Sequence, residues 1–236
     1  ILASALILPM SRTITFVFAG ITAVYYFFFY RNKMEFSFAQ QRWITIEEIN
    51  SGKEIDRNFA LGLHIPGRFD KILDINECFL QSPESNNILN ATRKFFKERN
   101  ISVYSTKTHT GYLRHLVIRQ AAHTSDLMIN LVTHYEDDSL MKEYTGFILK
   151  QVPHVTTLIN NINTKKASVA AGDYEKVFYG SGFIYDTIGD YKFRIGANSF
   201  FQTNTKQAEI LYKTALDYAD LNGDEIVYDL YSGAGT

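Results

Sequence analysis

The sequence predicts an α+β domain over residues 31–192, followed from residue 193 by the beginning of an α/β domain. The first domain is indicated by strand-like segments, several of them broken by glycines, that alternate with two helical patterns. The second is indicated by the apolar segment EIVYDL, which runs directly into the glycine-rich YSGAGT. A strand followed by such a turn is typical of open α/β sheets. Residues 1–30 form an atypical apolar segment.

Composition limits the classes of protein that fit this chain. Its 236 residues are 46% apolar, enough for a substantial core. The 24 basic residues balance 25 acidic ones, so no overall field attracts nucleic acid or an anionic membrane, and any nucleic-acid contact must be local. The single cysteine, Cys78, excludes an intramolecular disulfide framework and fits a reducing compartment. We therefore predict a cytoplasmic protein.

Residues 13–30 carry no charge and lie between Arg12 and Arg31. Their length is close to the roughly 20 residues of a membrane-spanning helix. Their β-branched and aromatic side chains, with Gly20 inside, suit buried strands equally well. A secretory signal is disfavoured because only one charge precedes the run and no small-residue cleavage site follows it. A membrane anchor, a buried insertion and a misassembled gene model stay open, and membrane association is expected only through this segment.

The middle of the chain contains several recognisable elements. Met34, Phe36 and Phe38 alternate with less apolar residues, which predicts a half-buried strand. Further strands are expected at 71–75, 116–119 and 127–133 and as short pieces within 168–190, and helices are expected at 86–100 and 139–151.

The predicted second domain begins with FRIGANSFFQTN and a helix. Asn204 is expected to cap this helix, with Gln207 at the capping-box position. One face of the helix is apolar and comprises Ala208, Leu211, Tyr212, Ala215, Leu216 and Ala219. The strand expected at 225–230 ends in an acid before the glycine turn. The turn indicates a cofactor site but does not distinguish a dinucleotide from S-adenosylmethionine, and it is not a P-loop because Gly-Lys-Ser/Thr is absent.

NSFFQTNTKQAEILY, followed about twenty residues later by YDLYSGAGT, resembles the RNA uracil-5-methyltransferase family. YRNKMEFSF, HIPGRFDKILDINECFLQS and HTGYLRHLVIR also resemble that family's central domain, so the likeness covers roughly residues 30–236. It implies that residue 193 begins a Rossmann-like, S-adenosylmethionine-dependent methyltransferase domain, and that the chain is incomplete at both ends. The implied cofactor-binding residues are Gln202, Tyr231, Gly233, Gly235 and Thr236. The alternatives are that Gln202 bonds the local backbone at the helix entry and that Tyr231 is a core aromatic residue.

The resemblance also implies a reaction. Carbon 5 of uracil becomes nucleophilic once a cysteine thiolate adds to carbon 6, and methyl transfer and proton abstraction follow. In the family that cysteine and the base lie beyond the glycine turn, so no catalytic residue is expected here and the chain alone should be inactive. Some members place the fourth ligand of a 4Fe-4S cluster where Cys78 stands. The alternative for Cys78 is a small buried apolar residue.

RNA contact is expected within residues 93–119, where seven basic residues face one acid and the net charge is +6. Arg114 and Arg119 are the strongest candidates, and the alternative is an ordinary solvated surface. The possible cluster ligand favours ribosomal RNA over transfer RNA, and a monomer is expected. Two rival functions stay open: a catalytically dead RNA-binding module and a membrane-tethered interaction domain.

Overall fold

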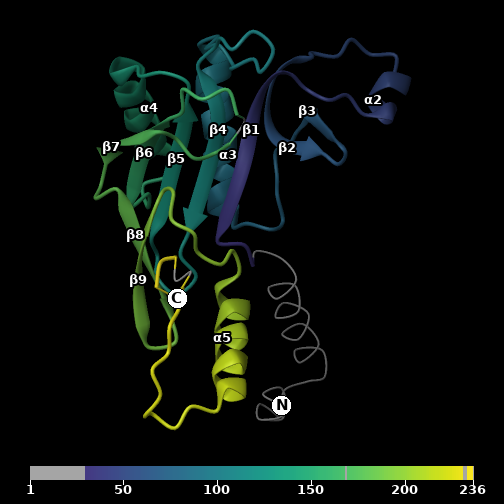
Figure 1. The fold of residues 1–236 in the computed structure, drawn as a ribbon. Coiled ribbons are helices and arrows are strands. Elements are labelled where there is room, and N and C mark those ends of the chain that lie inside the picture. Colours follow the sequence, from purple (N-terminus) through teal and green to yellow (C-terminus); the bar gives the residue numbers. More distant parts are fainter. Residues whose placement is uncertain (1–29, 168, 231–232, 236) are drawn as a thin grey trace, which may run out of the picture.

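In the computed structural model, which describes residues 30–167, 169–230 and 233–235, a seven-stranded mixed sheet forms the body of the molecule (Figure 1). The strand order is β3-β2-β1-β4-β5-β6-β7, and β8 and β9 form a separate two-stranded sheet. The elements are β1 Lys33–Gln41, α2 Ile46–Asn50, β2 Asn58–Ile65, β3 Arg68–Asp74, α3 Pro83–Glu98, β4 Leu113–Gln120, β5 Leu127–Thr133, α4 Asp138–Gln151, β6 Thr157–Ile162, β7 Tyr174–Tyr179, β8 Phe183–Ile188, β9 Tyr191–Gly196 and α5 Thr205–Ala219.

Strand β1 lies near the middle of the sheet, where its alternating pattern is required. Met34, Phe36 and Phe38 are buried in the main core, between the sheet and the helices. The intervening residues Lys33, Glu35 and Ser37 therefore lie on the opposite face of the sheet. The strand predicted from this alternation is confirmed.

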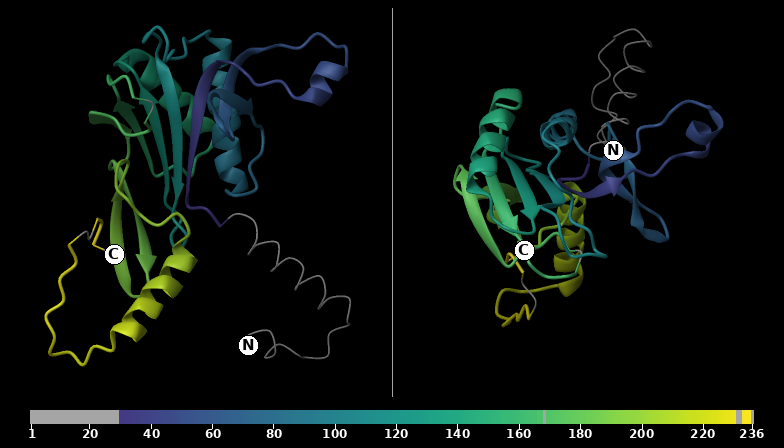
Figure 2. Two further views of the ribbon diagram at one scale, coloured as in Figure 1. Left: turned by 45° about the vertical axis from the view of Figure 1, so that its right-hand side comes forward. Right: turned by 90° about the horizontal axis from the view of Figure 1, so that it is seen from above.

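Helices α3 and α4 cover the same face of the sheet (Figures 1 and 2). Helix α3 begins three residues earlier than predicted, because Ser82 caps it and Pro83 occupies its first turn. The chain leaves it through Asn100, which has a positive φ of 52°. Between the helices, the rings of Phe95 and Phe96 pack against Tyr144. The two predicted helices are therefore confirmed, with shifted starts.

The pairing of β4 with β5 is antiparallel, as expected for the two predicted strands. Helix α4 then carries the chain across to β6, which pairs with β5 in parallel. Strand β6 escaped prediction because Asn160 and Asn161 interrupt its apolar sequence, although both are buried in the sheet. Asn160 is accommodated by donating to the carbonyl of Leu131 and to Thr133 Oγ1.

A second, smaller core joins β8, β9 and α5 to the other face of the sheet. Met128 and Ile159 project from that face and pack with a group made of Ile184, Ile188, Ile195, Ala197, Phe201 and Ala208. Figure 2 shows the hairpin and α5 on the side away from α3 and α4. The predicted boundary at residue 193 falls inside β9, and the division into domains stays a prediction.

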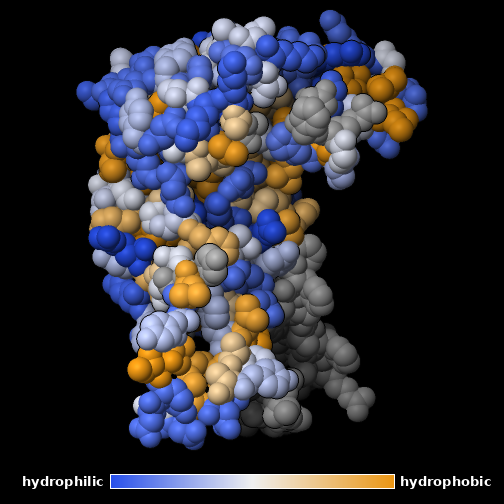
Figure 3. All heavy atoms as spheres, in the orientation of Figure 1, coloured by the Kyte–Doolittle hydropathy of each residue, from blue (hydrophilic) through white to orange (hydrophobic). Residues whose placement is uncertain are grey.

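The expectation of a strand at 225–230 is corrected. Residues 225–230 form no strand and are exposed, because no other described segment pairs with them. Helix α5 forms with the predicted Asn204 cap, yet its apolar face is largely uncovered: Leu211 and Leu216 are exposed. Figure 3 shows apolar residues gathered at this end of the molecule.

Among the described residues, no helix has the length and apolar character needed to cross a membrane. Residues 13–29 of the uncharged segment lie outside that part of the chain, so the three interpretations of the segment stay open. Helix α2 stands away from the sheet on a long arm between β1 and β2 (Figure 1).

Candidate functional site

The segment that links β9 to α5 contains NSFFQTN and is fixed to the sheet from two sides. On one side Asn32, just before β1, donates from Nδ2 to the carbonyl of Gln202 at 2.7 Å and to Thr205 Oγ1 at 2.8 Å. The backbone N–H of Asn32 also donates to the carbonyl of Thr203 at 2.8 Å. The start of β1 thereby sets the position of the first turn of α5.

The second anchor is Arg119 on β4. Its guanidinium donates to the carbonyls of Ala197 and Ser199, and its side chain is only 3% exposed. Burial lowers the pKa of Arg119 to about 10, with nearby Glu35 and Glu175 opposing the shift. The guanidinium therefore stays charged at neutral pH and makes charge-assisted bonds to the segment.

The two aromatic residues of the anchored segment lie in different environments. Phe201 is buried in the smaller core, whereas Phe200 is 65% exposed. Gln202, which follows Phe201, is partly exposed, and its side-chain amide has no hydrogen-bond partner among the described residues. The anchored segment therefore presents an aromatic ring, which can stack on a flat ligand, and an amide, which can hydrogen-bond.

Asp186 on β8 joins the hairpin, the β4–β5 turn and α5. Its carboxylate is fully buried and accepts from the backbone N–H groups of Ala122, His123 and Thr187 at 2.9–3.0 Å, and from Thr205 Oγ1 at 3.1 Å. Four donors satisfy the buried charge. The same Thr205 hydroxyl accepts from Asn32, so the two networks are continuous.

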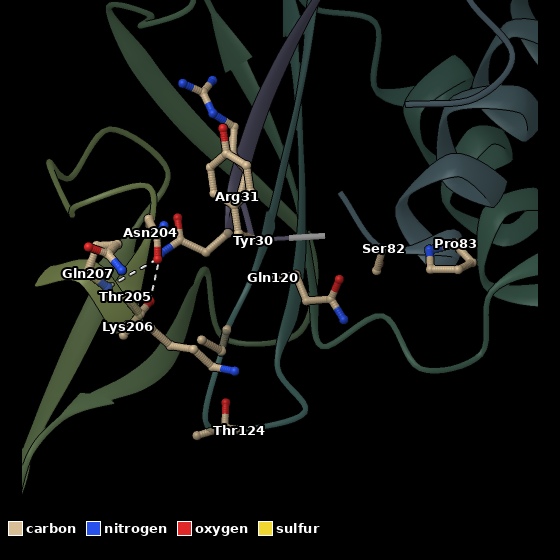
Figure 4. Close-up of a pocket in the computed structure, with 13 residues that line it drawn as sticks. Tyr30, Arg31, Ser82, Pro83, Gln120, Thr124, Asn204, Thr205, Lys206 and Gln207 are labelled. Atoms are coloured by element: carbon tan, nitrogen blue, oxygen red, sulfur yellow. Dashed lines mark hydrogen bonds between the residues drawn. The ribbon is translucent and has the colours of Figure 1, made fainter. Parts of the chain in front are cut away.

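A cavity of about 470 Å³ lies at this junction (Figure 4). Its lining includes Arg31, Gln120 and Thr124, together with the first turns of α3 and α5, whose capping residues are Ser82 and Asn204. The N-terminal ends of two helices give this cavity a positive potential.

The glycine turn lies elsewhere. Gly233 and Gly235 have φ of 57° and 84°, so both adopt the left-handed conformation that glycine permits. Gly235 lines a different cavity, of about 900 Å³, formed mainly by β9 and α5 residues such as Phe193 and Tyr212. Gln202 does not line that cavity, so the structure does not bring it together with the turn. Tyr231 and Thr236 lie outside the described residues.

Three arginines of the basic stretch 93–119 bond inside the protein, whereas the other four basic residues, Lys94, Lys97, Arg99 and Lys107, are exposed. Arg114, also 3% exposed, donates to the carbonyls of Asn163, Lys165 and Ala167 and stacks over the ring of Tyr104. Arg93 donates to Asp74 and to neighbouring carbonyls. Arg114 and Arg119 thus hold loops in this structure, and their predicted contact with RNA stays a prediction.

Cys78 is 7% exposed and packs in the main core. Its backbone N–H donates to Asn86 Oδ1 at 2.9 Å. Within the described ranges, no three His, Cys, Asp or Glu side chains are grouped so as to hold a metal ion. A buried apolar role accounts for its surroundings, and the cluster ligand stays a prediction.

Sequence reasoning missed Asn32, Asp186 and Phe200. Asn32 bonds to residues about 170 positions away, and two of the four donors to Asp186 lie more than 60 residues away, so no local pattern marks either residue. The sequence could have indicated that one of Phe200 and Phe201 is exposed, because adjacent aromatic residues at the entrance to a helix cannot both face the same core. The pattern did not indicate which of the two is buried.

Known proteins with similar sequences are RNA methyltransferases. No family model matches the chain. An uncharacterized RNA methyltransferase of Chlorobaculum tepidum is 43% identical over 209 residues, covering 88% of this chain and 43% of the relative. One of Bacteroides thetaiotaomicron is 40% identical over 211 residues, covering 88% and 46%. Over the shared region, the chain is homologous to these RNA methyltransferases. It spans less than half the length of each.

A solved structure extends the comparison. The Pyrococcus abyssi tRNA (uracil-54, C5)-methyltransferase, in complex with S-adenosyl-L-homocysteine, matches this chain with a TM-score of 0.60 and 26% identity. The match covers 80% of this chain and 41% of that one. It is consistent with the uracil-5 family that the motifs indicate, and the predicted mixed α+β fold is confirmed at that level.

Proposed function

We propose that this chain forms part of an enzyme that uses S-adenosylmethionine to methylate carbon 5 of a uridine in RNA. The observation that carries the proposal is the doubly anchored NSFFQTN segment, which presents Phe200 and Gln202 on a rigid support. The ring of Phe200 is suited to stack on an unpaired base, and the amide of Gln202 is suited to bind the cofactor. The similarity to RNA methyltransferases supports the same reaction class.

Carbon 5 of uracil needs activation by addition of a thiolate at carbon 6. Cys78 is the single cysteine of this sequence and is buried in the main core, away from solvent. It is therefore unsuited to attack RNA. Under the proposal, the thiolate and the base come from the larger protein, and this chain positions the cofactor and RNA.

The residues present suit S-adenosylmethionine in part. The free amide of Gln202 offers hydrogen bonds, and the turn at Gly233 and Gly235 allows a ligand to approach the backbone closely. Tyr231 and Thr236 complete the proposed set. When bound, S-adenosylmethionine supplies the methyl group.

For the substrate we propose a uridine of 23S ribosomal RNA, in a cytoplasmic and monomeric enzyme. The support for ribosomal over transfer RNA is the position of Cys78 in DINECFLQS, where some family members carry a 4Fe-4S ligand. The solved relative acts on tRNA, so both RNAs belong in the test.

The test uses the full-length protein, with S-adenosylmethionine labelled on its methyl group and purified ribosomal or transfer RNA. Digestion to nucleosides and mass spectrometry should find label in 5-methyluridine. Gln202→Ala should raise the KM for S-adenosylmethionine by about tenfold, as expected for the loss of a well-placed polar contact. Gln151→Ala, an exposed glutamine at the end of α4, is the matched control. Label on adenine or cytosine would reject the proposed reaction.

A further inference from the structure

The face of the sheet opposite α3 and α4 contains a cavity of about 450 Å³. Its floor is formed by strand residues that include Ser37, His115 and Val117, and its walls by Val169–Ala171 and Ala197–Asn198. That volume is within the range of small-molecule sites and is ample for one nucleobase. Asn198 begins the NSFFQTN segment, so the cavity lies directly beside the candidate site.

Three side chains on neighbouring strands form a polar row in the cavity. Ser37 Oγ lies 3.0 Å from His64 Nε2 and 3.1 Å from His115 Nδ1. The hydroxyl has one hydrogen, so it donates to one ring and accepts from the other. His64 Nδ1 and His115 Nε2 have no hydrogen-bond partner within the described part of the chain. The row therefore retains unused capacity to bind a ligand.

The same face of the sheet, beside the cavity, carries further buried polar atoms that have no partner among the described residues. Asn130 on β5 pairs with Val117 and is 1% exposed, yet neither Oδ1 nor Nδ2 has a partner. Asn161 Oδ1 is likewise buried and unpaired. Buried amides are usually hydrogen-bonded, and leaving one unpaired costs free energy. Such a concentration of unmet polar groups on one sheet face is more typical of a binding surface than of a core.

The charge of the cavity disfavours a phosphate. Lys33 and Glu35 form an ion pair at 2.5 Å and compensate each other. Burial, aided by the nearby Arg114, lowers the pKa of His115 to about 4, so this ring is neutral at physiological pH. Arg119 lies near Glu35 and Glu175, and its Nη2 donates to the carbonyls of Ala197 and Ser199. With no excess positive charge, the cavity suits a neutral ligand with polar edges.

The two buried arginines keep the walls in place. Arg114 holds the loop at 163–167, which leads into Val169–Ala171, and Arg119 holds the carbonyls of Ala197 and Ser199. The walls thus present small apolar side chains, while the polar row lies on the floor. A flat ring with donors and acceptors on its edge matches both surfaces.

We infer that this cavity binds an unpaired nucleobase of the RNA substrate, separate from the uridine that is methylated. The inference rests on the proposed RNA substrate. The base would lie against the apolar walls, and its edge would bond to Ser37, His64 and His115. Such a contact would select RNA by a base next to the target, which adds to the specificity of the enzyme.

The test measures the binding of the full-length protein to fluorescein-labelled single-stranded RNA by anisotropy, at fixed salt. The probes are 12-nucleotide homopolymers of U, A, C and G and an abasic 12-mer with the same number of phosphates. Ser37→Ala and His64→Ala are compared with Ser139→Ala, an exposed serine on α4. Equal thermal melting of the variants confirms that folding is retained.

For at least one homopolymer, we expect the ratio of its affinity to that of the abasic RNA to fall by about three- to tenfold in Ser37→Ala, as for the loss of one neutral hydrogen bond. Ser139→Ala should leave the ratio unchanged. An equal loss for base-containing and abasic RNA, or no loss, would overturn the inference. Methyl transfer is scored separately: an enzyme that methylates uridine but shows no such loss refutes the cavity alone. Absence of methylation refutes the proposed function instead.

Discussion

Replacing Asp186 tests whether one buried carboxylate holds the hairpin and α5 to the sheet. In Asp186→Asn the side chain keeps its size but exchanges one acceptor oxygen for a donor NH₂. If the NH₂ replaces Oδ2, Ala122 N–H and the Thr205 hydroxyl lose their acceptor. If it replaces Oδ1, the N–H groups of His123 and Thr187 lose theirs. Both orientations leave two donors unsatisfied.

An unsatisfied buried donor costs about 1–3 kcal/mol, and at about 1–2 kcal/mol for each of the two donors we expect Asp186→Asn to lower the free energy of unfolding by about 2–4 kcal/mol. Asp186→Ala should cost more, on the order of 4–5 kcal/mol, because all four donors lose their partner. For a chain of this size, the asparagine variant should melt about 4–16 °C lower. Circular dichroism during thermal unfolding measures the difference.

Asp190→Ala is the matched control, since Asp190 is exposed in the turn between β8 and β9. It should change the melting temperature by less than about 2 °C, as for an ordinary surface substitution. If Asp186→Asn melted as high as the wild-type protein, the four hydrogen bonds would not contribute as argued. The assignment of Asp186 as the link between α5 and the sheet would then be wrong.

Two further predictions concern the backbone and pH. Gly111→Ala should lower the free energy of unfolding, measured by urea titration, by about 2–4 kcal/mol, because φ is +114° and a Cβ would lie 2.3 Å from the carbonyl oxygen of Val103. The control is Gly146→Ala, where a Cβ on α4 meets open space. This substitution should raise the free energy of unfolding by about 0.5–1 kcal/mol. The pKa of His115 is lowered to about 4 in the fold against about 6.5 when unfolded, so its stabilising effect is complete above pH 6.5 and is lost as the pH falls towards 4. Between pH 6.5 and 4, the free energy of unfolding of His115→Asn should fall by about 2–3 kcal/mol less than that of the wild-type protein. Identical pH profiles of stability would contradict the burial of a neutral His115.

Local patterns predicted the elements that local physics determines. The alternation at Met34, Phe36 and Phe38 gave β1, and Asn204 marked the start of α5. Strand β6 was missed, because Asn160 is polar yet buried, and only its long-range partners make that possible. The strand expected at 225–230 failed for the converse reason: its sequence suits a strand, but no described segment supplies the neighbour that a strand needs.

The candidate site shows the same limit for charged residues. From the sequence, Arg114 and Arg119 in a stretch of net charge +6 suggested phosphate contacts. A long side chain beside a strand can instead reach backbone carbonyls of distant loops, and both arginines do so here. They therefore shape the surface offered to a ligand even where they do not touch it. Under the proposed nucleobase cavity, these arginines favour RNA binding by holding the walls of the cavity. Substituting either one should then reduce the preference for base-containing over abasic RNA, and should change the salt dependence of binding less.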